Sequence, residues 1–146
     1  MSVIIDLADV VVALLNAETF APTFTAERKY RPADDLGDLS TLTVLVVPKT
    51  QVLEPLTRGT NRNEYTLDIG VMKRVTAETN VILDAFMDLA EDVLDLLVSP
   101  SNRILTVGSD KANWIRAEVD PIYDPESLKV ESVFISVIRI TYMIAR

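Results

Sequence analysis

Hydrophobic residues recur along this chain with two different periods, and the period predicts which segments are helices and which are strands. Residues 4–16 place apolar side chains three and four positions apart, with Asp6 and Asp9 in the first turns, which predicts an amphipathic helix. A longer helix is predicted from an N-cap at Thr79 or Asn80 to residue 98, before Ser99 and Pro100. Its predicted core face consists of Ile82, Ala85, Phe86, Leu89, Val93, Leu96 and Leu97.

Alternating and continuous apolar runs predict the strands. Residues 64–73 alternate, with Tyr65, Leu67, Ile69 and Val71 on one face. Residues 42–47 are apolar on both faces and stop at Pro48, which predicts an interior strand. Residues 132–146 form one long predicted strand whose first half is also apolar on both faces, so this strand should be interior too. Shorter strands are expected at 23–30, 103–107 and 113–119.

Polar segments separate these elements at 31–40, 49–63 and 121–128. Residues 49–63 contain Pro55 and Gly59 and are too polar for a core, so we expect a long exposed loop or an extended hairpin tip. The order of elements lacks regular βαβ alternation. We therefore predict an α+β fold, a twisted and mostly antiparallel sheet packed by two main helices, in a single domain spanning 1–146.

Composition excludes several classes of protein. A hydrophobic content of 49% excludes a disordered chain, and the apolar runs are too short to cross a bilayer. No basic segment precedes the first apolar stretch, so we expect a cytosolic protein without membrane partners. The absence of cysteine and histidine removes thiol chemistry, the usual general base and the commonest transition-metal ligand.

The net charge of −8 opposes duplex DNA binding as a principal activity, because phosphate neutralisation by Lys and Arg supplies most of that affinity. Acidity has two other interpretations. It keeps a protein soluble, or it lines a channel whose negative wall lets a duplex slide past.

Acidic residues concentrate on the outer face of the second helix, at Asp84, Asp88, Glu91, Asp92 and Asp95. A divalent-cation site or an acid–base pair would need ligands that converge from another element, and the sequence contains no EF-hand or histidine pattern. A solvated face is the simplest interpretation. The alternative is a surface that meets the basic loops of a neighbouring subunit or faces a negative channel.

Basic residues form a second candidate surface, because Lys49, Arg58 and Arg62 lie in the polar segment 49–63. Such a group is either an exposed loop or a contact with a partner. Arg28, Lys29 and Arg31 fit a solvated strand end, Trp114 fits the core or a cover on the sheet, and Gly70 fits a bulge or close packing on a helix. We find no nucleophile with a base and no phosphate-binding loop, so neither an enzyme nor a cofactor is expected.

Four segments together resemble a known family: Ala26-Glu27-Arg28-Lys29-Tyr30, residues 43–49, residues 65–74 and the terminal strand 134–146. In this order and spacing they resemble the small neck proteins of tailed bacteriophages, in particular the tail completion or tail terminator proteins. The resemblance implies an α+β protomer in a six-fold ring that caps the tail tube, ends its polymerisation and joins the head.

The same resemblance implies the partners and the location. The partners are further copies of the chain, the tail tube protein, the head–tail connector or head-closure protein, and genomic DNA that passes through the lumen without specific binding. The location is the virion neck, reached from the host cytoplasm during assembly. We assign protein contacts to Lys49, Arg58 and Arg62, and a lumen-facing or neighbour-facing acidic surface to Asp84, Asp88, Asp92 and Asp95.

Three alternatives remain open at this point. A head-closure or connector-adaptor protein would share the small size and the ring. An acidic inhibitor would imitate DNA with its carboxylate helix and act as a monomer. An acid–base or metal-dependent enzyme would use the same aspartates and would be stabilised by a cation.

Overall fold

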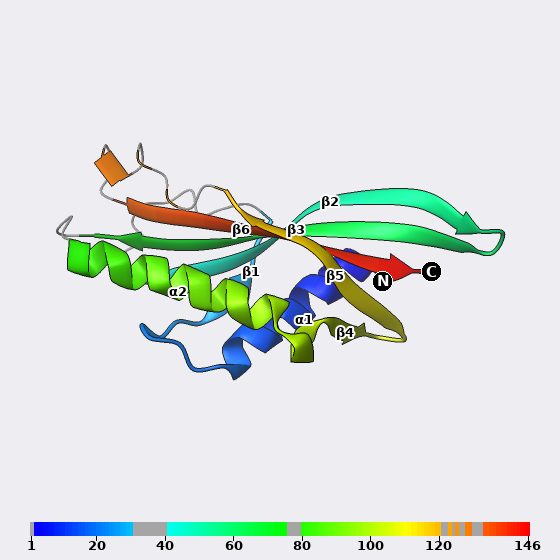
Figure 1. The fold of residues 1–146 in the computed structure, drawn as a ribbon, viewed down its shortest axis with the longest axis horizontal. Helices are drawn as coiled ribbons and strands as arrows, with labels where there is room; N and C mark the ends of the chain where they lie inside the picture. The colour runs from blue at the N-terminus through cyan, green and yellow to red at the C-terminus, as the bar shows by residue number, and fades with distance from the viewer. Residues whose placement is uncertain are drawn as a thin grey trace.

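Six strands form one curled mixed sheet, and two long helices cover one of its faces (Figure 1). A computed structural model describes residues 2–30, 41–75, 80–120, 123, 125, 128, 129 and 133–146. The elements in chain order are α1 (Val3–Ala17), β1 (Ala26–Arg28), β2 (Thr43–Thr57), β3 (Thr60–Arg74), α2 (Asn80–Val98), the short 3-10 helix η2 (Pro100–Asn102), β4 (Ile104–Val107), β5 (Asp110–Val119) and β6 (Val133–Ala145). The expected α+β class is confirmed.

The order of strands across the sheet is β1-β2-β3-β6-β5-β4. Only β1 and β2 pair in parallel, and all other neighbours are antiparallel. The last strand, β6, lies between β3 and β5, and it pairs with β3 from Val133 opposite Arg74 to Ala145 opposite Arg62. The prediction of an interior terminal strand is therefore confirmed.

The core forms on the sheet face that carries the helices. Tyr65, Leu67, Ile69 and Val71 of β3 are at most 2% exposed, as their alternation predicts. Ile138, Ile140, Tyr142 and Ile144 continue this face on β6, and Leu7, Val11 and Leu15 cover it from α1. Each fully buried aliphatic side chain contributes about 1.5–3 kcal/mol of transfer free energy. Helix α1 contacts β1, β2 and β4, so the curled sheet brings strands from both of its edges to this helix.

Helix α2 begins at Asn80 and ends at Val98, and it is rotated slightly from the predicted orientation. Its buried residues are Phe86, Leu89, Ala90, Val93 and Leu97. Ala85, which we expected in the core, is exposed, and Ala90 is buried in its place. The Phe86 and Phe134 rings lie 5.6 Å apart and fix one end of α2 on β6. At the other end, Ser99 and Asn102 each donate a hydrogen bond of 2.9 Å to the carbonyl oxygen of Leu96.

Strand β2 does not stop at Pro48, contrary to the prediction. It continues to Thr57, and with β3 it forms a hairpin whose register shifts next to Pro48 and again next to Pro55. Proline is tolerated in a strand at a bulge or where the missing N–H faces an open edge. The two register shifts are the bulges, and the other edge of β2 has no strand partner beyond Val46 among the described residues, because β1 pairs with β2 only at Val44–Val46. The segment 49–63 is thus the extended hairpin, one of the two forms we considered.

The structure also gives the environments of Gly108, Gly70 and Trp114. Strands β4 and β5 form a hairpin through Gly108 and Ser109, and Gly108 has the positive φ of 62° that two-residue turns require. Gly70 lies opposite Leu45 with no register shift beside it, so it marks no bulge. Among the described residues, a Cβ there would meet only the side chain of Met72, at 3.4 Å, so the predicted close packing on a helix is not found in this part of the chain. Trp114 packs against the core and lies under the Arg103 guanidinium, 5.3 Å from the ring centre, so it covers the sheet.

Some predicted features lie outside the described residues. They are Arg31, Thr79, the loop 31–40 and most of 121–128.

Candidate functional site

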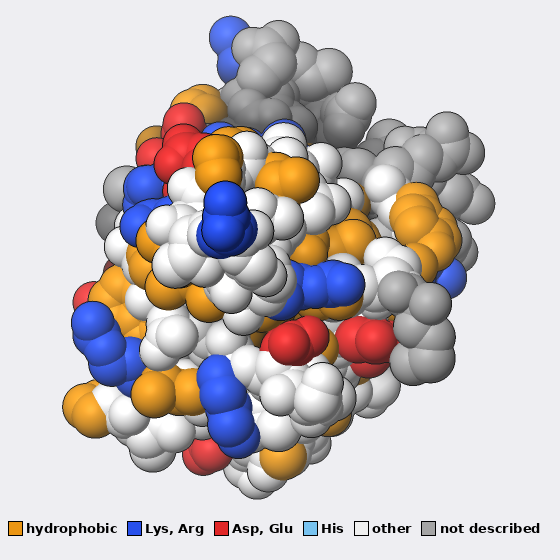
Figure 2. Space-filling view, turned by 90° about the vertical axis from the view of Figure 1, so that its right-hand side faces the viewer, with side chains coloured by type: hydrophobic (Ala, Val, Ile, Leu, Met, Phe, Trp, Pro, Cys, Tyr) orange, Lys and Arg blue, Asp and Glu red, His pale blue; other side chains and the backbone are white. Residues whose placement is uncertain are grey.

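The outer half of the β2–β3 hairpin, residues 50–61, is the most exposed part of the sheet, and we call it the arm. It extends beyond the rest of the sheet, and its tip is a two-residue turn at Arg58 and Gly59 (Figure 1). Val52, Leu53 and Leu56 are 50%, 57% and 53% exposed. Hydrophobic and basic side chains lie together on this end of the molecule (Figure 2). Each of these three side chains is already about half buried, so covering it fully against a partner would contribute about 0.7–1.5 kcal/mol.

One edge of the arm is open. The pairing of β1 with β2 ends at Val46, after which only Lys29 donates a further backbone hydrogen bond, of 3.1 Å, to the Val46 carbonyl. Beyond Val46, the outer edge of β2 has no strand partner among the described residues. An unpaired strand edge presents a row of backbone donors and acceptors that readily pairs with another chain. The arm therefore offers both apolar side chains and free backbone groups.

The base of the arm is held firmly. The Asn61 amide donates to the Arg146 carbonyl at 2.7 Å, and the Arg146 amide donates back to the Asn61 carbonyl at 2.9 Å. The side chain of the buried Asn63 donates from Nδ2 to the Ile144 carbonyl oxygen, and its Oδ1 accepts a hydrogen bond from the Gln51 side chain. The C-terminus thus fixes the position of the arm while its tip stays exposed.

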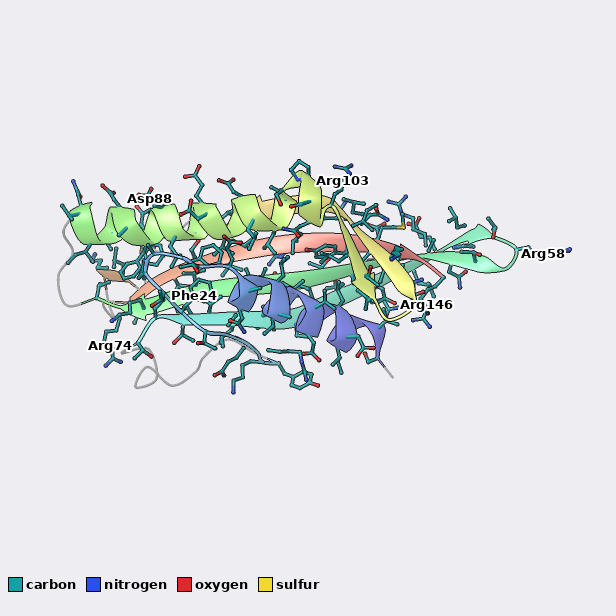
Figure 3. All side chains as sticks on the ribbon, turned by 90° about the horizontal axis from the view of Figure 1, so that it is seen from below. Phe24, Arg58, Arg74, Asp88, Arg103 and Arg146 are labelled. Carbon is teal, nitrogen blue, oxygen red and sulfur yellow. The ribbon has the colours of Figure 1, made fainter. Side chains whose placement is uncertain are left out.

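The three basic residues that we predicted as one contact surface are separated by the structure. Lys49 forms an ion pair with Asp68 at 3.0 Å, and Arg62 forms one with Glu64 at 3.3 Å. Arg58 lies at the far tip of the arm (Figure 3) and has no ion pair with any described residue. Of the three, only Arg58 presents an uncompensated charge to a partner.

The residues of the predicted acidic surface lie along the exposed side of α2. Asp84, Asp88, Glu91, Asp92 and Asp95 are all exposed, and we call them the acidic stripe. In the part of the chain that the structure describes, none of the five forms an ion pair. Carboxylates three and four residues apart on a helix repel each other. A positively charged partner would relieve that repulsion.

A cavity of about 300 Å³, which we did not predict, lies beside the acidic stripe. Its lining residues are Met87, Ala90, Glu91 and Leu94 of α2, Val119 of β5 and Ser136 of β6. The Ser136 hydroxyl is fully buried and has no hydrogen-bond partner among the described residues. An orphaned buried hydroxyl is unfavourable by about 1–3 kcal/mol. No sequence signal marks such a serine, because its neighbours come from elements far apart in the chain.

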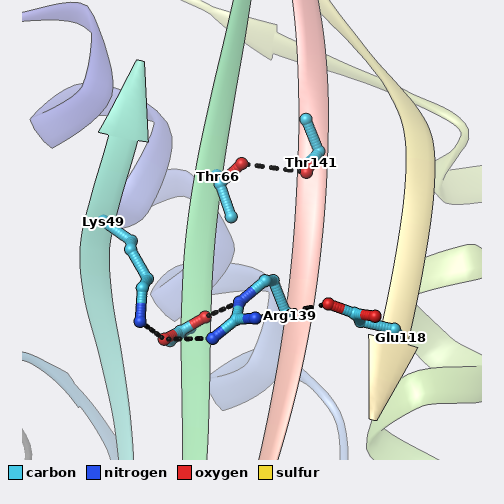
Figure 4. A network of polar contacts seen from close by, with 6 residues as sticks. Lys49, Thr66, Glu118, Arg139 and Thr141 are labelled. Atoms are coloured by element: carbon cyan, nitrogen blue, oxygen red, sulfur yellow. Dashed lines mark hydrogen bonds and ion pairs between the residues drawn. The ribbon is translucent and has the colours of Figure 1, made fainter. Parts of the chain in front are cut away.

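A ladder of charges crosses the sheet face opposite the helices (Figure 4). The Asp68 carboxylate on β3 accepts from Arg139 on β6 at 2.9 Å and pairs with Lys49 on β2, and Arg139 also reaches Glu118 on β5 at 3.3 Å. Hydrogen bonding to Asp68 raises the pKa of Arg139, so its guanidinium stays charged wherever the protein is folded. This ladder is internally neutral and joins four strands, which is typical of a structural network.

A second cluster lies on the same face, nearer the arm. Glu64 accepts from Arg116 of β5 at 2.9 Å and from Arg62 at 3.3 Å, so Arg116 spans β6 to reach β3. Next to the ladder, the hydroxyls of Thr66 and Thr141 share a hydrogen bond of 2.9 Å. At the edge of the sheet, Arg28 pairs with Asp9 of α1 at 2.7 Å, and this hydrogen bond raises the pKa of Arg28.

The described residues contain no group of three or more acidic side chains placed to hold a metal ion. Neither helix within them is long and apolar enough to span a membrane. No protein-family model matches the chain, and no curated protein matches it by sequence.

Proposed function

We propose that this chain is a structural protein of a tailed bacteriophage, which assembles as a ring on the head-proximal end of the tail tube. The ring ends polymerisation of the tube and provides the surface to which the head is joined, and DNA passes through its lumen. The family resemblance of segments 26–30, 43–49, 65–74 and 134–146 is the starting point for this proposal.

The observation that carries the proposal furthest is the arm. It combines three half-exposed hydrophobic side chains with a strand edge and a cation, Arg58, that have no strand or ion-pair partner among the described residues, at the end of a hairpin whose base is fixed. Ordinary folded surfaces avoid long unpaired edges with apolar side chains, because these lead to association. Such a feature is useful to a protein that must assemble.

The acidic stripe is compatible with two places in the ring. In a lumen it would repel the DNA backbone and prevent adhesion. At a subunit boundary it would attract the basic tip of a neighbour. A ring requires head-to-tail contacts between two different patches of one chain, and the arm and the acidic stripe are two such patches.

A phage from which the gene has been deleted tests this function. We expect full heads and separate tails of irregular length in negative-stain images, because nothing ends the tube or joins it to the head. Heads that have lost their DNA, together with tails of normal length, would instead identify a head-closure or connector-adaptor protein. Normal joined particles would contradict a role in the neck altogether.

The acidic stripe also fits a second candidate function, an inhibitor that imitates DNA. Five exposed carboxylates along one helix, without an ion pair to any described residue, resemble the regular negative charge of a phosphate backbone. That function predicts a monomer that is absent from virions and competes with DNA for an enzyme. Detection of the chain in purified particles would exclude it.

A further inference from the structure

The cavity beside α2 is suited to a small apolar group that also carries positive charge. Most of its wall is aliphatic, from Met87, Ala90, Leu94 and Val119, whereas Glu91 contributes a carboxylate. Its volume of about 300 Å³ is at the lower limit of ligand pockets, enough for a side chain and part of its backbone. The acidic stripe continues from Glu91 along the helix.

The cavity also contains a buried group that lacks a partner. Ser136 is 0% exposed, and its hydroxyl has no hydrogen-bond partner in the described ranges. Buried hydroxyl groups in folded proteins are normally hydrogen-bonded. An occupant that brings a backbone N–H or carbonyl group into the cavity would satisfy it.

The arm tip has each of these properties. Leu56 is 53% exposed, and Arg58, two residues further on, has no ion pair with a described residue. The open edge of β2 supplies unpaired backbone donors and acceptors beside Leu56. The tip therefore matches the cavity in apolar character, in charge and in hydrogen-bonding capacity.

The tip cannot reach the cavity of its own chain. Arg58 and Asp88 lie towards opposite ends of the molecule (Figure 3), and the arm points away from α2 (Figure 1). The base of the arm is fixed by the paired hydrogen bonds between Asn61 and Arg146. A contact between tip and cavity must therefore join two copies. Since its two patches differ, it is a head-to-tail contact, the kind of contact that builds a ring when its rotation closes.

We propose that the arm tip of one copy docks in the α2 cavity of the next, with Leu56 inside the cavity and Arg58 against Glu91 and the acidic stripe. This inference rests on the proposed function, because it names the contact that builds the ring. It assigns the acidic stripe to the subunit boundary.

Disulfide crosslinking tests the contact directly, because the natural chain has no cysteine. A chain with Leu56→Cys and Met87→Cys is assembled into virions and oxidised. We expect a ladder of covalent multimers on a non-reducing gel, which ends at the size of the ring. The control chain pairs Leu56→Cys with Thr106→Cys, an exposed position on β4, and should give no ladder.

The outcomes separate this contact from the function. If copies occupy the neck but the chain with Leu56→Cys and Met87→Cys gives no covalent multimers, the contact is wrong and the proposed ring is unaffected. A disulfide from Leu56→Cys to a reporter cysteine in the tail tube protein would show that the arm binds the tube, with the same consequence. Absence of the chain from virions would overturn both.

A charge exchange gives an independent test with exposed residues whose substitution should not disturb folding. Arg58→Glu and Glu91→Arg should each lower the titre of a complemented deletion phage by about tenfold or more, because each places like charges together. The double variant should recover most of the titre. Lys111→Glu, the same charge reversal on the exposed β4–β5 hairpin, is the matched control. Failure of the double variant to recover, or unchanged titre in both single variants, would overturn the contact.

Discussion

At the scale of single residues, the sheet depends on a few polar side chains that connect its strands. Asp68 is the centre of the charge ladder: its side chain is 16% exposed and pairs with both Lys49 and Arg139. Glu118, at the end of the ladder, is 56% exposed and pairs with Arg139 alone. Screening by water weakens exposed ion pairs, so the two carboxylates should differ in importance.

Replacing Asp68 with asparagine should lower the free energy of unfolding by about 1–2 kcal/mol, because two cations lose their shared counter-charge in a partly buried site. Glu118→Gln, which removes one rim contact, should change it by less than about 0.5 kcal/mol. Urea unfolding of both variants measures the difference. Equal effects would show that the ladder acts only as a set of surface charges.

The burial of Tyr142 makes the free energy of unfolding depend on pH. Its side chain is fully buried and its hydroxyl has no partner among the residues described, so burial raises the pKa of the phenol well above its usual value. The folded state then holds the proton more tightly than the unfolded state. This contribution is complete below about pH 10 and is lost as the pH rises towards the folded pKa, by up to about 1.4 kcal/mol per pH unit.

Tyr142→Phe should therefore reduce the loss of stability above pH 10, and it should leave stability at pH 7 unchanged or slightly increased. Tyr65→Phe is the control, since Tyr65 is similarly buried and its hydroxyl accepts from Gln51. The control should still lose stability above pH 10, because Tyr142 is still present. Thermal unfolding between pH 7 and 11.5 measures both, and a parallel pH profile for all chains would contradict the assignment.

At the scale of elements, the arm is distinct from the core of the sheet. Val52, Leu53 and Leu56 lie outside the core cluster, although they belong to β2, the strand whose Val44 and Val46 are part of that core. Val71, fifteen residues along the hairpin from Leu56, is by contrast fully buried beneath the helices. The same hairpin therefore serves the fold at one end and is free to serve a partner at the other.

Substituting Val52, Leu53 and Leu56 together by threonine should change the free energy of unfolding by no more than about 0.5 kcal/mol per site, because all three are exposed. The same variant should lose ring assembly. Val71→Thr is the contrasting control and should destabilise the fold by about 1–3 kcal/mol, because it buries a hydroxyl. Calorimetry and a count of copies per virion measure the two effects. Full assembly of the triple variant would show that the hydrophobic side chains of the arm are not required for the ring.

The elements that could be predicted from sequence are those whose own periodicity decides their environment. Helices α1 and α2 and strand β6 carry unbroken patterns, and all three formed within about one residue of their predicted limits. Strand β3 also formed as predicted, but it begins at Thr60, four residues before the predicted start at residue 64. Strand β2 was predicted too short, because a proline is tolerated only when the neighbouring edge is open, and that depends on where β1 ends. The cavity was missed for a similar reason: Ser136 becomes an orphan only when α2 packs over β6.

At the scale of the whole molecule, the two ends have different chemistry. Arg58 at the arm tip lies at one end, and Asp88 of the acidic stripe lies towards the other (Figure 3), on the helix α2 that also lines the cavity. The interior strand β6 connects them, since it anchors α2 through Phe134 and holds the arm base through Arg146. Folding and the orientation of the arm therefore depend on the same strand.

A chain truncated after Thr141 should fail to fold, because it loses Tyr142 and Ile144, which are both fully buried, and the backbone pairing of Arg146 with Asn61. Loss of two such side chains is worth about 3–6 kcal/mol, a large share of the stability of an ordinary domain. Arg146→Ala keeps the backbone bonds and should fold normally. Circular dichroism and sedimentation measure both, and a folded, ring-forming truncated chain would contradict the role given to β6.

The central claim is that this chain forms a ring at the junction of tail and head, and imaging its position in an intact particle tests that claim most directly. Electron cryomicroscopy of purified virions should show a closed ring of copies on the head-proximal end of the tail tube, into which this fold fits with the arm of each copy on α2 of the next. Density for the chain elsewhere in the particle, or virions that contain no copy of it, would contradict the account.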